Sequence, residues 1–185
     1  MRLGIRLAPA AAAGALLLAL ASDAGAVTDT NFTYSAFKLG SYVISPLEMV
    51  PDTAASMAGF VDRIGFSDIT NTSNSRICFS TALKLPTGAW IYSLEVFLKD
   101  GFTEDTDPLA VFYRYDPVAN TNEALVNNSI KYDDDTRHTK TYFITNNNFR
   151  LTNTDKYAYG FGFCIPKDGA FFGARIRYHY NSAGE

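Results

Sequence analysis

The 185-residue chain has only two cysteines, two histidines and one tryptophan. Two cysteines are too few for a structural zinc site unless histidines join them. The sequence Gly-x-Ser-x-Gly does not occur, which excludes a serine hydrolase of the nucleophile-elbow type. Any other Ser–His–Asp triad would need His138 or His179, and each has an arginine close by in the sequence. We therefore interpret both as surface histidines.

Helical hydrophobic periodicity is almost absent, which excludes parallel βαβ folds because these need helical connections. Bulky residues instead alternate with small or polar ones over short stretches that Gly, Pro, Asn and Asp separate, as is typical of strands and turns. The pattern predicts an all-β fold, an antiparallel jelly-roll-like β-sandwich of roughly eight to ten strands. The expected strands are residues 31–39, 41–50, 76–85, 89–99, 109–116, 140–145, 156–165 and 171–180, with a break at Gly40, a helical turn at 54–60 and a turn at 117–122.

The alternation also predicts which side chains share a face. In residues 89–99 it places Trp90 and Tyr92 with Leu94, and in residues 171–180 it turns Arg175, Arg177 and His179 outward. Residues 156–165 have an aromatic face opposite a nearly bare one, formed by Ala158, Gly160, Gly162 and Cys164. Small residues on a strand allow another chain to approach closely.

Neither charge sign is in large excess. The composition is 47% hydrophobic and 19% charged, with a formal net charge of −3, which is typical of a folded globular protein and unlike a disordered chain. Nucleic acids and anionic membranes attract proteins with a concentrated excess of Lys and Arg. We therefore expect no nucleic-acid partner.

The first 26 residues have the pattern of a signal peptide. Arg2 and Arg6 precede an apolar stretch at 10–20, and Ala24-Gly25-Ala26 is a small-x-small cleavage site. The alternative is a membrane anchor, but a spanning helix needs roughly 20 apolar residues. The sequence predicts a signal peptide at 1–26 and a single β-sandwich domain at 27–185, exported to the periplasm or the extracellular space without a transmembrane anchor in the mature chain.

Export bears on the two cysteines, Cys78 and Cys164. In an oxidising compartment an isolated pair tends to form a disulfide, which we predict here. The alternative is a pair of buried thiols that act as small hydrophobic residues.

Three stretches of sequence resemble a known group of proteins. They are Leu85-Pro86-Thr87-Gly88-Ala89, followed by a strand and Asp100, then Tyr113-Arg114-Tyr115-Asp116-Pro117, and finally Gly173-Ala174-Arg175-Ile176-Arg177-Tyr178. Over residues 76–180 the chain resembles exported bacterial β-sandwich proteins of unassigned function. The resemblance implies the fold and the compartment, and it implies no catalytic residue.

Carboxylates suggest two kinds of site. Glycoside hydrolysis needs a pair of carboxylates, one with a raised pKa, and Glu95 lies in an apolar strand where burial would raise its pKa. The preferred alternative is that Glu95 faces solvent or pairs with a Lys or Arg of the next strand. The run Asp133-Asp134-Asp135 and the acidic residues of 104–107 are candidates for a Ca²⁺ site, although such loops are usually solvated turns. No other cofactor is expected.

The tyrosines give the clearest indication of binding. Three pairs share a face because their members are two residues apart: Tyr113 with Tyr115, Tyr157 with Tyr159, and Tyr178 with Tyr180. An exposed pair would form a platform for a sugar ring, whereas the alternative is an ordinary place in the core. Arg175 and Arg177 are candidates for binding an anion or a carboxylated glycan, or simply discourage edge-to-edge aggregation.

Together these patterns predict an exported, non-catalytic β-sandwich module that acts by binding or by assembly at the cell envelope or outside the cell. Self-association through residues 31–39, as a free N-terminal strand, is one route. The first alternative is a carbohydrate-binding module that uses exposed tyrosines, and the second is a sandwich-fold glycoside hydrolase.

Overall fold

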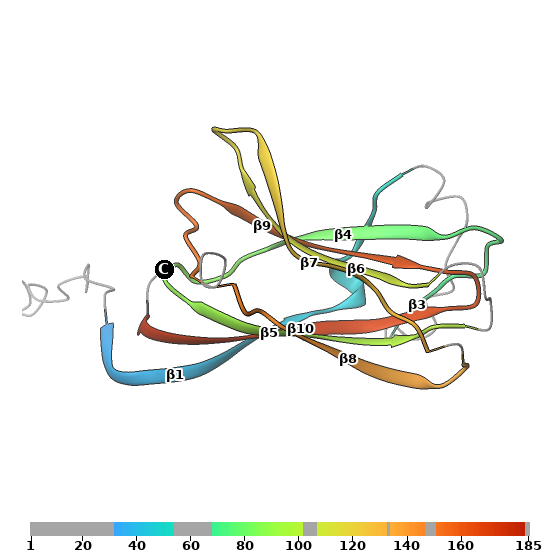
Figure 1. Ribbon diagram of the computed structural model, residues 1–185, viewed down its shortest axis with the longest axis horizontal. Coiled ribbons are helices and arrows are strands. Elements are labelled where there is room, and N and C mark those ends of the chain that lie inside the picture. The colour runs from blue at the N-terminus through green and yellow to red at the C-terminus, as the bar shows by residue number, and fades with distance from the viewer. Residues whose placement is uncertain (1–31, 54–67, 102–106, 133, 147–150, 184–185) are drawn as a thin grey trace, which may run out of the picture. The chain divides into compact units, whose positions relative to one another are not determined.

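The computed structural model describes residues 32–53, 68–101, 107–132, 134–146 and 151–183 (Figure 1). They form ten strands and one short 3-10 helix. The elements are β1 Phe32–Ile44, η1 Pro46–Glu48, β2 Val50–Pro51, β3 Ile69–Thr70, β4 Ile77–Leu83, β5 Trp90–Lys99, β6 Leu109–Asp116, β7 Thr121–Ser129, β8 Arg137–Phe143, β9 Ala158–Ile165 and β10 Ala170–Ala183. Within these ranges, no helix has the length and apolar character needed to span a membrane.

The strands form two antiparallel sheets, visible as two layers in Figure 1. Sheet A has the order β1-β10-β5-β8, and β3 also pairs with β10. Sheet B has the order β2-β4-β9-β6-β7. The predicted jelly-roll-like antiparallel β-sandwich is therefore confirmed.

Phenylalanine rings hold the two sheets together. Phe161 and Phe163 of β9 face Phe171 of β10, with ring centroids 5.9 and 4.8 Å from that of Phe171. All three rings are at most 1% exposed, and Phe79 and Phe112 join them in the core. Removing such large apolar side chains from water is the main favourable contribution to folding.

The boundaries predicted near the N-terminal strand were wrong, and the strand expected at 140–145 is β8, Arg137–Phe143. β1 runs through Gly40 without a break, because the missing side chain leaves room for Tyr178; an added Cβ would lie 2.7 Å from the Cζ of that ring. The expected strand at 41–50 instead ends at Ile44, where Pro46 starts the 3-10 helix. The helical turn expected at 54–60 lies outside the described residues.

The sequence also failed to predict β7, whose first two residues lie in the turn expected at 117–122. Along Thr121–Ser129 only Val126 is buried, because β7 is the outer strand of sheet B. An edge strand of this kind has little apolar alternation to reveal it.

A β-bulge in β5 corrects the predicted face of Trp90. Arg177 of β10 pairs with Ser93, but the next residue, Tyr178, pairs with Ile91, so Tyr92 is an extra residue without a register partner on β10. The bulge shifts the alternation by one position. As a result Ile91 is completely buried and Trp90, at 36% exposed, lies on the outer face instead of with Leu94 in the core.

The predicted disulfide joins Cys78 to Cys164. The two residues are direct register partners on β4 and β9, with Cα atoms 4.0 Å apart, and they lie on the outward face of sheet B, opposite the core residue Phe79. The bond closes a loop with a sequence separation of 86 residues. A cross-link over so long a loop restricts the unfolded chain strongly.

Replacing Cys78 and Cys164 together by serine is expected to lower the free energy of unfolding by about 2 to 5 kcal/mol, because the unfolded chain regains its freedom. Guanidinium titration of the oxidised wild type and the double variant measures the difference. Far-UV circular dichroism at neutral pH serves as the control that the variant is folded. An unchanged unfolding midpoint would contradict a stabilising role of the bond.

Candidate functional site

The outward face of sheet B contains a groove with a floor of small side chains. The floor is formed by β4 and β9. Next to the groove, no outward side chain of these two strands is larger than serine. The small lining residues are Ser80, Ala82 and Ala158, and Gly160 lies beside them as the register partner of Ala82. These strands are paired directly, Ser80 opposite Gly162 and Ala82 opposite Gly160, so the small positions lie side by side.

Tyr113 of β6 lies across the floor of this groove. Its register partner is Gly160, and a Cβ added there would lie 2.7 Å from the Tyr113 Cε2 and still closer to the end of the ring. The ring therefore rests against the glycine backbone, as only a residue without a side chain allows. Burial, with the nearby charge of Asp52, raises the pKa of the Tyr113 hydroxyl, so Tyr113 stays neutral at physiological pH.

Polar groups surround the ring of Tyr113. Tyr115, two residues along β6, lines the same groove and donates a hydrogen bond to the Asn120 Oδ1 at 2.9 Å. Asn122 lines the groove from β7, and Ser80 donates to the Asp52 carboxylate. With Val50 at one side, the groove has a volume of about 530 Å³. An aromatic surface bordered by amides and hydroxyls is suited to binding a flat ligand that has both apolar and hydroxyl groups.

The second predicted tyrosine pair is not an exposed platform. Tyr159 borders the groove but is only 3% exposed, and its hydroxyl accepts a hydrogen bond from the Asn153 N–H at 3.0 Å. Tyr157 contacts two cations instead, with the Arg114 guanidinium 4.2 Å and the Lys156 ammonium 4.9 Å from its ring centroid. Alternation along β9 turns the side chain of Tyr159 toward the core. A place in the core was the alternative to an exposed platform for this tyrosine pair.

Glu95 lacks the raised pKa that the sequence predicted for a catalytic acid. It lies on the outward face of sheet A, where its carboxylate accepts hydrogen bonds from the Nε of Arg175 at 2.8 Å and of Arg177 at 2.6 Å. Burial raises the pKa of Glu95, but the hydrogen bonds from Arg177 and Arg175 outweigh it and lower the pKa below its usual value. The hypothesis of a raised pKa is wrong, and the ion pair with the neighbouring strand is confirmed.

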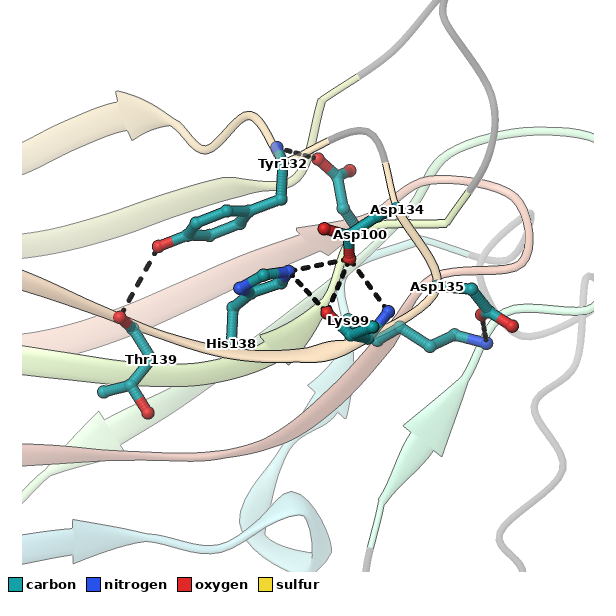
Figure 2. A network of polar contacts seen from close by, with 8 residues as sticks. Lys99, Asp100, Tyr132, Asp134, Asp135, His138 and Thr139 are labelled. Carbon is teal, nitrogen blue, oxygen red and sulfur yellow. Dashed lines mark hydrogen bonds and ion pairs between the residues drawn. The ribbon is translucent and has the colours of Figure 1, made fainter.

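The acidic residues proposed for Ca²⁺ have separate partners (Figure 2). Asp134 contacts the His138 Nε2 at 2.7 Å, and this contact, with hydrogen bonds from Thr136, lowers the pKa of Asp134 to about 2. Asp135 pairs with Lys99 at 2.5 Å. Asp133 and residues 104–106 lie outside the described part of the chain, and the described residues contain no group of three or more His, Cys, Asp or Glu that would hold a metal.

His138 is more than a simple surface residue. Its ring stacks on Tyr132 with centroids 3.7 Å apart, and the backbone N–H of Tyr132 donates to the buried Asp100 at 2.7 Å. Figure 2 shows Asp100, Tyr132 and His138 close together, and His138 belongs to the start of β8. These contacts give Tyr132, Asp134 and His138 partners within the fold, which is a structural role.

The sequence predicted Tyr113 and Tyr115 but missed the residues around them. Val50, Ser80 and Asn122 come from three other strands, β2, β4 and β7, and join the tyrosines only through the strand order of sheet B. The one available signal was the nearly bare face of residues 156–165, which indicated that something approaches β9 closely. That neighbour is the Tyr113 side chain.

Replacing Glu95 by Gln leaves two guanidinium groups without their carboxylate, and we expect the free energy of unfolding to fall by about 1 to 3 kcal/mol at neutral pH. The folded-state pKa of Glu95 is lowered, so its stabilisation is present above the unfolded pKa and is lost as the pH falls through the folded value. The difference between wild type and E95Q should therefore shrink toward acid pH in urea titrations. The exposed Glu48→Gln is the control, and an E95Q difference independent of pH would contradict the pairing.

Known proteins resemble this chain in fold. No family model and no curated protein match it. Among solved structures it is similar to a xylan-binding module CBM15, with a TM-score of 0.51 and 10% identity over 76% of this chain and 97% of that one. It is also similar to the C-terminal CBM6 of LamC, a laminarinase of Zobellia galactanivorans, with a TM-score of only 0.36 and 13% identity over 74% and 98%. The first likeness shows that this chain has a β-sandwich fold that a carbohydrate-binding module also adopts.

Proposed function

We propose that the protein is a non-catalytic carbohydrate-binding module that holds a neutral glycan in the groove of sheet B. The observation that carries the proposal is the ring of Tyr113, held against Gly160 in an open groove of about 530 Å³. The Tyr113 ring borders the open space of the groove, and Tyr115 extends this aromatic border along the same strand.

The chemistry of the groove suits a pyranose ring. Such a ring has apolar C–H groups on its faces and hydroxyls around its rim, so it packs against an aromatic side chain while its rim forms hydrogen bonds. Asn122 and Ser80 supply an amide and a hydroxyl from the strands beside the tyrosines. The fold shared with a xylan-binding module is consistent with this use of a sheet face.

The other predicted functions have less support. The candidate acid of the hydrolase hypothesis was Glu95, which lies on sheet A, away from the groove, and is held there by Arg175 and Arg177. Assembly through residues 31–39 as a free strand has less support, because β1 pairs with β10 of its own sheet at Phe32 and Thr33 and again from Lys38 to Ile44. Binding is the function that uses residues the fold brings together.

We further propose that residues 1–26 act as a signal peptide and that the single domain 27–185 works in the periplasm or outside the cell. The Cys78–Cys164 disulfide supports this, since such bonds persist in oxidising compartments. The described domain is then a binding module delivered to where glycans are found.

Calorimetric titration with xylohexaose, cellohexaose and laminarihexaose tests the glycan proposal. We expect at least one of the three to bind, and Tyr113→Ala to weaken its binding by about tenfold or more, because the stacking surface is lost. Tyr113→Phe keeps the ring and should bind nearly as well as the wild type. If none of the three binds at millimolar concentration, or if Y113A binds like the wild type, the groove is not the glycan site.

A matched pair of glycine variants tests the geometry itself. In Gly160→Ala the new methyl group overlaps the Tyr113 ring and must displace it, whereas in Gly162→Ala the nearest atom is the Phe79 carbonyl oxygen at an ordinary 3.6 Å. We expect G160A to weaken glycan binding and G162A to leave it unchanged, measured by the same titrations. Equal effects of the two substitutions would contradict the proposed position of the ring.

A further inference from the structure

Four aromatic side chains gather on the outward face of sheet A, on the opposite side of the sandwich from the groove. They are Phe37 of β1, Trp90 and Tyr92 of β5, and His179 of β10, and together they line an aromatic pocket of about 420 Å³. The His179 ring lies edge-on to Tyr92 at 5.0 Å and to Phe37 at 6.3 Å. Trp90, the only tryptophan of the chain, is 36% exposed and Phe37 63% exposed.

Two irregularities in strand pairing build this pocket around His179. On one side of β10, the register of β1 shifts between Thr33 and Lys38, the stretch that contains Phe37. On the other side, the bulge at Tyr92 turns Trp90 outward, opposite His179. β-Bulges redirect side chains and are common beside functional sites. Without the bulge in β5, Trp90 would face the core with Leu94.

Positive charge borders the pocket. Arg177 lies two residues from His179 and beside Tyr92. Its contacts with Glu95 and, to a smaller extent, with Tyr92 raise the pKa of the Arg177 guanidinium. Arg175 and Arg177 share the single carboxylate of Glu95, so this cluster keeps an excess of one positive charge. The Arg177 side chain is 38% exposed, compared with 14% for Glu95, and its guanidinium has further donors besides those that contact Glu95 and Tyr92.

We propose that the aromatic pocket and Arg177 form a second binding site, for a sugar unit that carries a carboxylate, a uronic acid residue. The sugar ring packs against Trp90 and Tyr92, and its carboxylate accepts hydrogen bonds from the guanidinium of Arg177. Glu95 acts as a positioning residue, because it fixes the direction of that guanidinium. The excess positive charge favours an acidic sugar over a neutral one.

This site uses none of the residues of the sheet B groove, so it stands or falls independently of the function proposed there. A neutral glycan lacks the carboxylate that Arg177 would bind. A purely apolar ligand would leave the arginine at the border of the pocket unused.

Calorimetric titration with tetragalacturonic acid and with its fully methyl-esterified form tests the proposal at low salt. We expect the acid to bind about tenfold or more tightly than the ester, and Trp90→Ala and Arg177→Gln each to weaken binding of the acid to a similar degree. Arg175→Gln is the matched control, because it removes the other partner of Glu95 without touching the pocket. Thermal unfolding of each variant checks that it is folded.

The groove variant Tyr113→Ala separates the two sites. It should bind tetragalacturonic acid like the wild type while losing neutral oligosaccharides, and W90A should do the reverse. The proposal is overturned if tetragalacturonic acid does not bind, if acid and ester bind equally, if R175Q weakens binding as much as R177Q, or if Y113A abolishes binding of the acid. It is also overturned if size-exclusion chromatography shows a wild-type dimer that W90A dissociates, because a second copy then occupies the pocket.

Discussion

The alternation of side chains along β9 is the constraint on which the rest of this structure depends. Its inward residues, Phe161 and Phe163, pack on Phe171 of the opposite sheet and so join the two layers. Its outward residues include Gly160, against which Tyr113 lies. One strand thus supplies both the centre of the core and the floor of the groove, and a register slip of one residue would exchange the two faces and destroy both.

The fold was predictable because alternation is a local property of the sequence, and strands such as Leu109–Asp116 keep it over their whole length. The failures have physical causes that no local pattern contains. Trp90 faces outward because of a bulge that only the pairing of β5 with β10 defines. Gly40 continues β1 because the Tyr178 ring, far away in the sequence, fills the space beside it. In both cases a contact between distant segments decides the local conformation.

The candidate site, like the fold, was predictable from the sequence only in part. That Tyr113 and Tyr115 share a face follows from their spacing alone, but which face is open depends on what lies beneath, and that is Gly160 of another strand. For Glu95 the sequence allowed a buried acid or an ion pair, and cross-strand register chose between them by placing Arg175 directly opposite. The sequence therefore identifies the chemical groups, and the strand order determines which groups they contact.

The disulfide has a consequence for the strand that forms the groove floor. Gly160 and Gly162 lie in the interior of β9, where each glycine loses more backbone freedom on folding than other residues and weakens the strand by roughly 0.5 to 1 kcal/mol. Cys164 lies two residues further along the same outward row and ties β9 to β4. The covalent bond offsets the entropy cost of the glycines, so a strand bare enough to accommodate an aromatic ring remains part of a stable sheet.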